Sequence, residues 1–200
     1  MPSPAAVRFG DGLKRADKLI KLVGDLRLRP QTRADSVDFS HAALAALVAA
    51  WDAYLNKIVD DFYVATSNPL DTKYHSVHSL AKTASERALK KFNTPNYENS
   101  RNLLIEWTGF DPLPWWVWPS KSMTPLLVQQ RLNEILKIRH SFAHGFSIPN
   151  YAWATSGAGK VELKVDAVRS TRSLLNQLVI QTDKGLSDFL ISDYSVTVGW

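Results

Sequence analysis

The chain has 200 residues, with no cysteine and with seven Trp, six Tyr and eight Phe. Its length fits one domain whose core is large enough to fold unaided, and a hydrophobic share of 45% beside 22% charged residues is typical of a globular protein. The absence of cysteine excludes a disulfide framework, a zinc site built on thiolates, an iron–sulfur cluster and a cysteine nucleophile. No apolar run of about 18 residues and no secretory signal pattern is found, so we expect a cytoplasmic protein with no membrane span.

The net charge of +5 is concentrated at the start of the chain. Residues 1–33 hold eight Lys or Arg against three Asp, whereas residues 34–200 hold sixteen charges of each sign. A basic element beside a neutral domain favours contact with a polyanion such as RNA. A solvated helix face without a partner is the alternative. The residues that we expect to contact RNA are Lys14, Lys18, Lys21, Arg27 and Arg29.

Helical periodicity dominates the first half of the chain. A first helix is predicted over residues 12–26, with Asp11 as its N-cap and with Gly24 and Pro30 after its apolar positions. The strongest prediction is a helix from Ser40 to Ala65, in which large apolar residues recur every three or four positions. A second stripe on this helix consists of alanines, which let another helix approach closely. Two apolar faces place this helix at the centre of a bundle or at an interface.

Two shorter helices and an aromatic loop follow. The helices are predicted over residues 76–92 and 97–108, each ended by turn-forming residues. Residues 109–119 contain three Pro and three Trp, so regular structure is excluded there. We expect this loop to close one end of the core; stacking of its Trp side chains on bases is the alternative.

The last part of the chain predicts a helix over residues 124–144, a small β-hairpin and a final helix capped by Asp166. The hairpin strands are residues 151–155 and 161–165 around the turn 156–159. The predicted fold class is therefore all-α, a helical bundle with a small hairpin before the last helix. We divide the chain into a basic N-terminal helix that packs on or flanks the domain (1–34), the domain itself (35–191) and a tail (192–200).

The segment IRHSFAHG, residues 138–145, is the densest polar cluster in an otherwise apolar helix. Arg139 follows Ile135 by four residues, so its guanidinium is expected on the packed side, where it needs an anion or a carboxylate. His144 lies at the helix end, where the helix dipole favours a protonated imidazole. An arginine that neutralises a phosphate and histidines that move protons suffice for RNA cleavage, because the RNA 2′-hydroxyl is itself the nucleophile. Ser141 is expected to face elsewhere.

The same residues leave other interpretations open. His140 and His144 have the i, i+4 spacing of two zinc ligands, although no HExxH motif and no cysteine accompany them. A serine nucleophile would need a strained elbow that the sequence lacks. A helix terminus in which Arg139 pairs with an acid and His144 caps the helix requires no function. We expect no metal and no cofactor.

Several segments resemble one family. Arg139-x4-His144 at the end of a late helix, followed by Gly145, is similar to the Arg-x(4–6)-His motif of HEPN-domain ribonucleases. The segments HAALAALVAAWDAYLNKIVDDFY, TPNYENSRNLLIEWTGFDP, RLNEILKIRHSFAHG and KVELKVDAVRSTRSLLNQLV resemble successive elements of the RiboL-PSP-HEPN subgroup. The resemblance covers roughly residues 35–190, and the basic first helix is the part least typical of the family.

The resemblance implies a HEPN-type bundle that forms a homodimer, with Arg and His of both protomers in one active site. It implies a metal-independent endoribonuclease that leaves a 2′,3′-cyclic phosphate and often serves in toxin–antitoxin or antiphage systems, with an antitoxin or regulatory protein as partner. Arg139 would bind the scissile phosphate and His144 would transfer protons. His140 stands where the family often has Asn, and would transfer protons or orient the phosphate. The alternatives are a catalytically silent module that binds RNA or a nucleotide, and a helical adaptor that docks a protein.

Overall fold

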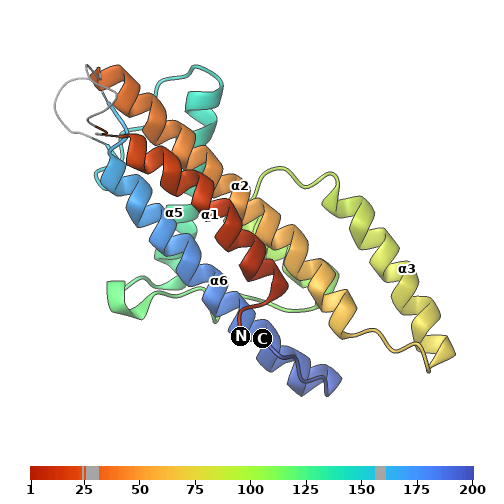
Figure 1. Cartoon of the computed structure of the whole chain (residues 1–200). Helices are drawn as coiled ribbons and strands as arrows, with labels where there is room; N and C mark the ends of the chain where they lie inside the picture. The colour runs from red at the N-terminus through yellow and green to blue at the C-terminus, as the bar shows by residue number, and fades with distance from the viewer. Residues whose placement is uncertain (24, 26–31, 156–160) are drawn as a thin grey trace.

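The computed structural model describes residues 1–23, 25, 32–155 and 161–200. In this part of the chain the structure is helical, which confirms the all-α prediction (Figure 1). The helices are α1 (Pro4–Leu22), α2 (Arg33–Ala65), α3 (Thr72–Leu89), α4 (Tyr97–Thr108), α5 (Pro125–Ala143) and α6 (Val165–Tyr194), with a 3₁₀ turn η2 (Pro119–Lys121).

The long helix α2 lies at the centre and contacts each of the other α-helices. It begins at Arg33, earlier than the predicted Ser40, because Thr32 and Asp35 form a capping box. The Thr32 hydroxyl accepts from the Asp35 amide (3.1 Å), and the Asp35 carboxylate accepts from the Thr32 amide (2.8 Å). The polar first turns carry no apolar periodicity, so only the cap marks the true start.

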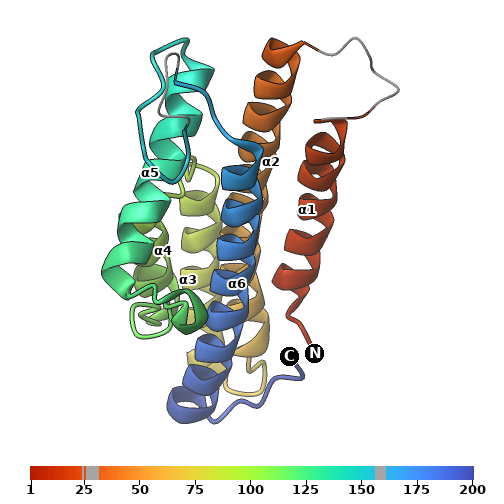
Figure 2. The same cartoon turned by 90° about the vertical axis from the view of Figure 1, so that its left-hand side faces the viewer.

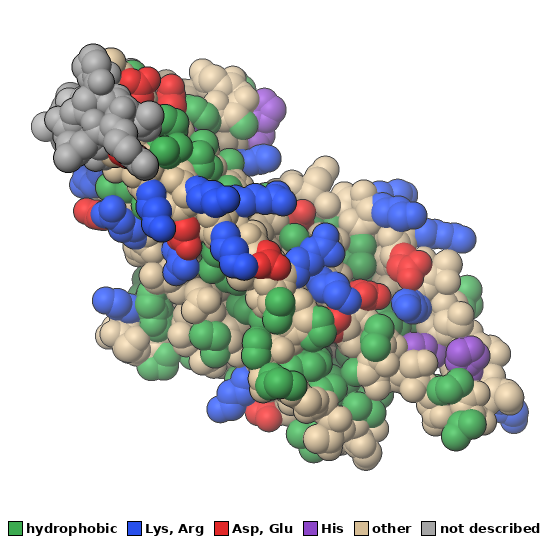
Figure 3. All heavy atoms as spheres, viewed as in Figure 1, with side chains coloured by type: hydrophobic (Ala, Val, Ile, Leu, Met, Phe, Trp, Pro, Cys, Tyr) green, Lys and Arg blue, Asp and Glu red, His purple; other side chains and the backbone are tan. Residues whose placement is uncertain are grey.

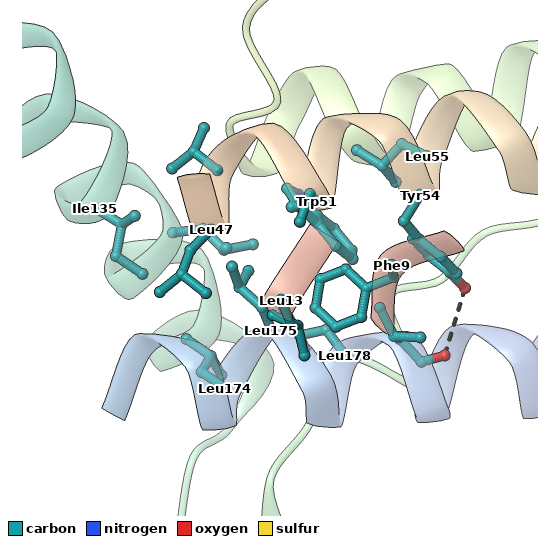
Figure 4. Packing of buried hydrophobic residues seen from close by; sticks show 14 of the residues in the cluster. Phe9, Leu13, Leu47, Trp51, Tyr54, Leu55, Ile135, Leu174, Leu175 and Leu178 are labelled. Carbon is teal, nitrogen blue, oxygen red and sulfur yellow. Dashed lines mark hydrogen bonds between the residues drawn. The ribbon is translucent and has the colours of Figure 1, made fainter. Parts of the chain in front are cut away.

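The core forms where α2 meets α1 and α6. Figure 4 shows Trp51 and Tyr54 of α2 packed among Phe9 of α1 and the leucines of α6. The Tyr54 hydroxyl lies 2.9 Å from Asp183 Oδ1, which also accepts from the Ser3 hydroxyl (2.9 Å). These bonds tie the start of α1 and the middle of α6 to the central helix, because each buried polar group finds its partner on another element.

The first helix differs from its prediction. It begins at Pro4 with Ser3 as N-cap, whose hydroxyl accepts from the Ala6 amide at 2.9 Å, so Asp11 is inside the helix and is not a cap. The helix ends at Leu22 with Val23 as its C-cap, earlier than the predicted end at residue 26, and Gly24 and Pro30 lie outside the described residues. The apolar side of α1 is fully part of the single core, through Ala5, Phe9, Leu13, Ala16 and Ile20.

The approach of α1 to α2 depends on a glycine. A Cβ placed on Gly12 would lie 2.7 Å from the Cβ of Ala50 and 3.3 Å from its Cα. The alanine stripe of α2 therefore does admit a neighbouring helix, as its small side chains indicated. Of the other alanines of the stripe, Ala42, Ala45 and Ala49 are exposed to solvent, and Ala46 and Ala53 are half-buried.

The aromatic loop closes the core, as predicted. Trp116 is fully buried, and its indole N–H donates to the Thr182 hydroxyl of α6 at 2.9 Å. Its ring packs edge-on against Trp51 and Tyr97. Trp115 lies against Gly185, where an added Cβ would come within 2.7 Å of its ring.

The other boundaries show smaller differences. Helix α4 has the predicted bounds, α3 begins at Thr72 after the N-cap Asp71, and α6 continues to Tyr194 into the predicted tail. Of the predicted hairpin, the described residues show one antiparallel bridge between Thr155 and Leu163, and its turn lies outside them. The division of the chain at residue 34 stays a prediction.

By length and composition the segment Ala34–Ala65 could cross a membrane, which the count of uninterrupted apolar residues did not indicate. However, 56% of its most apolar stretch is buried inside the domain. Burial of this kind is typical of the core helix of a globular protein.

Two glycines of α1 provide a test of the helix packing. We expect Gly12→Ala to destabilise the protein by about 1–3 kcal/mol, because its new Cβ overlaps Ala50. Gly10→Ala is the matched control: no described atom lies within 4 Å of its added Cβ, so the better helix former should stabilise by about 0.5–1 kcal/mol. Urea unfolding of both variants measures the difference, and equal stabilisation by the two substitutions would show that α1 and α2 are not in close contact.

Candidate active site at the end of α5

The end of α5 carries Arg139, His140 and His144. All three side chains are exposed, and His144 is the C-cap residue of the helix. The His140 and His144 rings have centroids 4.2 Å apart, inclined by 48°. The i, i+4 spacing thus places both imidazoles on one face, as expected.

The chain turn after α5 fixes the position of this pair. The Gly145 amide donates to the Phe142 carbonyl (3.2 Å) and the Phe146 amide to the Ser141 carbonyl (2.8 Å), which is the Schellman pattern. Gly145 has a φ of 68°, in the left-handed region that residues with a side chain rarely adopt. As a result Phe146 folds back, with its ring 5.9 Å from that of His144.

A ring stack joins the end of α5 to α2. His41 of α2 is buried, and its ring lies parallel to that of Phe142 at a centroid distance of 4.0 Å. Neither ring nitrogen of His41 has a hydrogen-bond partner among the described residues. Burial lowers the pKa of His41 to about 4, so the imidazole is neutral at pH 7 and packs as an apolar ring.

Beside this helix end lies a cavity of about 660 Å³ between α2, α5 and the segment that precedes α4. Arg139 and His140 are part of its wall, whereas His144 is not among the lining residues. The remaining wall combines small apolar side chains with amides and charges: Ala45, Val48, Ala49, Asp52, Asn93, Thr94, Pro95, Asn96, Glu98, Asn133, Leu136, Lys137, Ser141 and Pro149.

Two expectations about α5 are corrected. Arg139 is exposed and does not point into the packed side, because Ile135 and Ile138 already fill that side. Ser141 does not face elsewhere: it is buried and lines the same cavity as Arg139. No carboxylate among the described residues forms an ion pair with Arg139, so its guanidinium is available to an external anion.

Asp52 is a cavity residue that sequence reasoning missed. Its Oδ1 is buried and has no hydrogen-bond partner in the described part of the chain. Desolvation raises the pKa of its carboxyl above the ordinary value of 3.8. The sequence feature that could have identified Asp52 is its spacing: it follows Val48 by four residues, which places a carboxylate on an otherwise apolar face of α2. Sequence reasoning missed Lys137 as well. This lysine lies one residue before Ile138, and it is the second cation in the cavity wall, beside Arg139.

The lysines predicted to contact RNA are not brought to this cavity. Lys14, Lys18 and Lys21 are exposed on α1, where Lys14 pairs with Asp11 at 2.6 Å. Figure 2 shows α1 and α5 on opposite sides of α2 and α6, and Figure 3 shows Lys and Arg side chains along the face that includes α1. Arg27 and Arg29 lie outside the described residues.

The spacing of His140 and His144 left metal binding open as an alternative. Within residues 1–23, 25, 32–155 and 161–200, no group of three or more His, Asp or Glu side chains could hold a metal ion.

The unpartnered carboxylate of Asp52 predicts a pH-dependent cost to stability. A raised pKa means that the folded state binds the proton more tightly, so the cost is absent below pH 3.8, grows as pH rises to the folded-state pKa and is complete above it. Asp52→Asn should therefore raise stability at pH 7 by about 1 kcal/mol. Asp38→Asn, at an exposed position of the same helix, should change it by less than about 0.5 kcal/mol.

Denaturant unfolding between pH 3 and pH 8 measures this difference. A gain from Asp52→Asn that stayed constant over the whole range would contradict the assignment, because it could not arise from ionisation of the carboxyl.

Comparison with known proteins identifies the family. No curated protein and no solved structure matches the chain significantly. A family model described as RiboL-PSP-HEPN matches residues 11–186, which include α2 through α5, most of α6 and the greater part of α1. The first helix, expected to be the least typical part, is thus largely inside the match. The chain belongs to the RiboL-PSP-HEPN family.

Proposed function

We propose that the protein is a metal-independent endoribonuclease whose active site is the end of α5. The observation that carries this proposal is the guanidinium of Arg139, which no described carboxylate pairs with, at the same helix end as the rings of His140 and His144, whose centroids lie 4.2 Å apart. Arg139 and His140 both belong to the wall of an open cavity. Membership of the RiboL-PSP-HEPN family supports it, because HEPN domains are often ribonucleases.

The chemistry requires only groups of this kind. Arg139 would bind the scissile phosphate and stabilise the negative charge that develops as the 2′-oxygen attacks phosphorus. His144 would accept the 2′-hydroxyl proton, and a second imidazole would donate a proton to the leaving 5′-oxygen. The new bond joins the 2′-oxygen to phosphorus and the bond to the 5′-oxygen breaks. The products are a 2′,3′-cyclic phosphate and a 5′-hydroxyl.

His140 is the nearest candidate for the second imidazole within one protomer. A homodimer would offer another, because a second copy of the site would supply a further Arg139 and His144 to a composite active site. The aromatic side chains beside the histidines support such an interface, since Phe146 is 62% exposed and Phe142 is 42% exposed. Apolar rings left in solvent beside a polar site are typical of a contact surface.

The biological setting that we propose is a cytoplasmic toxin or antiphage effector, held in check by an antitoxin or regulatory protein. A catalytically silent HEPN module that binds RNA or a nucleotide through Arg139 is the alternative. A helical adaptor is the third hypothesis, and in that case neither Arg139 nor His144 would matter.

Cleavage of mixed RNA in excess EDTA tests the proposed activity. We expect wild type to cleave and to leave 2′,3′-cyclic phosphate ends, whereas Arg139→Ala and His144→Ala should each lose at least about 100-fold in rate, because each removes a charge or proton transfer made in the transition state. Product ends can be identified by phosphatase resistance and mass spectrometry.

Arg87→Ala and His75→Ala are the matched controls, because both residues are exposed on α3, away from the cavity. Circular dichroism establishes that all four variants fold. Unchanged RNA affinity in His144→Ala without cleavage by wild type would favour the silent binding module instead.

Mixing two inactive variants tests the composite site. A dimer of one Arg139→Ala and one His144→Ala protomer keeps one arginine and one histidine, so co-expression should restore at least about one tenth of the wild-type rate if both protomers contribute to one site. If each protomer carried a complete site, the mixed dimer would stay inactive. Sedimentation of the wild type as a monomer at assay concentration would contradict the dimer directly.

A further inference from the structure

The cavity beside Arg139 extends well beyond the groups that the cleavage chemistry needs. Its volume of about 660 Å³ falls within the roughly 300–1,000 Å³ that small-molecule sites occupy. Its wall includes Ala45, Val48 and Ala49 of α2 and Leu136 of α5, which are small or apolar. Apolar walls with a few polar groups are typical of pockets that receive an aromatic ring.

The position of the cavity links it to the proposed substrate. Because Arg139 and His140 belong to its wall, a phosphate held by Arg139 would lie at the cavity. Proteins recognise single-stranded RNA by accepting bases that leave the stack and by hydrogen bonding to their Watson–Crick edges. A base next to the scissile phosphate is therefore the natural occupant.

The two acids of the cavity differ in their hydrogen bonding. Glu98 Oε1 accepts from the side-chain amides of Gln129 (2.9 Å) and Asn133 (3.2 Å). Asp52 has a buried Oδ1 with no partner in the described residues, and no cation offsets the desolvation of its carboxyl. An acceptor without a partner is costly, and Asp52 belongs to the cavity wall, so a donor in the cavity toward which its carboxyl turns gains binding energy. Asp52 is thus the polar group that a ligand would satisfy.

We propose that this cavity is a subsite for guanine, which donates from its Watson–Crick edge to the carboxylate of Asp52. The inference rests on the proposed function and names the base beside the scissile phosphate. An ionised carboxylate only accepts hydrogen bonds. Guanine alone among the four bases places two donors side by side on this edge, N1–H and the N2 amino group. In adenine and cytosine an acceptor lies beside the amino group, and uracil places its single N–H between two carbonyl oxygens.

Oligodeoxynucleotides that contain one ribonucleotide test the subsite. Cleavage is confined to the position of the 2′-hydroxyl, so the base of the ribonucleotide and that of the next nucleotide can be varied separately. We expect guanine at one of the two positions to be cleaved about tenfold faster than adenine there, the factor that one hydrogen bond to a charged group supplies. Inosine, which lacks the N2 amino group, should lose most of this advantage.

Asp52→Asn should remove the preference for guanine over adenine, because the amide offers a donor where the carboxylate accepted. Asp38→Asn is the matched control on the same helix and should keep the wild-type ratio, since Asp38 is exposed and outside the cavity. Cleavage by wild type without a guanine preference, or a preference that survives Asp52→Asn, would overturn the proposal while leaving the ribonuclease activity established.

Calorimetric binding of guanosine 3′-monophosphate keeps the two proposals apart. We expect it to bind wild type about tenfold more tightly than adenosine 3′-monophosphate does, and Ala49→Phe, which fills the cavity from α2, should abolish both. If wild type does not cleave RNA, this selectivity and its loss in Asp52→Asn still support the subsite. Equal affinity for the two nucleotides overturns it.

Discussion

The fold depends on how completely the other helices bury the apolar faces of α2. This helix carries apolar side chains on more than one face, so it must be packed on several sides at once, and it contacts α1, α3, α4, α5 and α6. Trp51, Leu55 and Ile58 are fully enclosed. On the side of Ala45 and Ala49 the side chains are too short to reach the next helix, and these alanines are exposed in the cavity wall. The candidate site is therefore the place where the covering of the central helix is incomplete.

The chemistry-bearing end of α5 is held by contacts that need no charge. The parallel stack of His41 on Phe142 joins it to α2, and the Schellman turn through Gly145 satisfies the carbonyls of Ser141 and Phe142. Both contacts constrain the backbone and leave the exposed imidazoles of His140 and His144 unconstrained by hydrogen bonds to described residues. A helix end fixed in this way can present proton-transfer groups to a substrate without using them for its own stability.

The features that the sequence predicted well are local ones. The bounds of α4 follow from Asn96 and Gly109, which cap its two ends directly, and the approach of His140 to His144 follows from helix geometry alone. The start of α1 was missed because its cap, Ser3, precedes two glycines that weaken the helical pattern. Asp52 was missed, because a carboxylate on an apolar helix face does not by itself show which face of α2 the neighbouring elements leave open. The exposure of Arg139 has the same origin: periodicity places it near Ile135, but only the packing of Ile135 and Ile138 decides which side chains remain in solvent.

The separation of α1 from the cavity bears on how RNA would be bound. Contacts between lysines and phosphates contribute affinity without sequence information, whereas contacts to base edges provide specificity. The exposed lysines of α1 are suited to phosphate contacts. The cavity beside Arg139, which is lined by amides and carboxylates, is suited to contacts with base edges. Because the two lie on opposite sides of α2 and α6 (Figure 2), a strand held by α1 would have to pass around the bundle to reach Arg139 of the same protomer. Such a path would order more nucleotides than the proposed reaction needs. If the protein cleaves RNA as proposed, the local cations Lys137 and Arg139 are therefore the better candidates for holding the scissile phosphate, and α1 is better suited to distant parts of a long RNA.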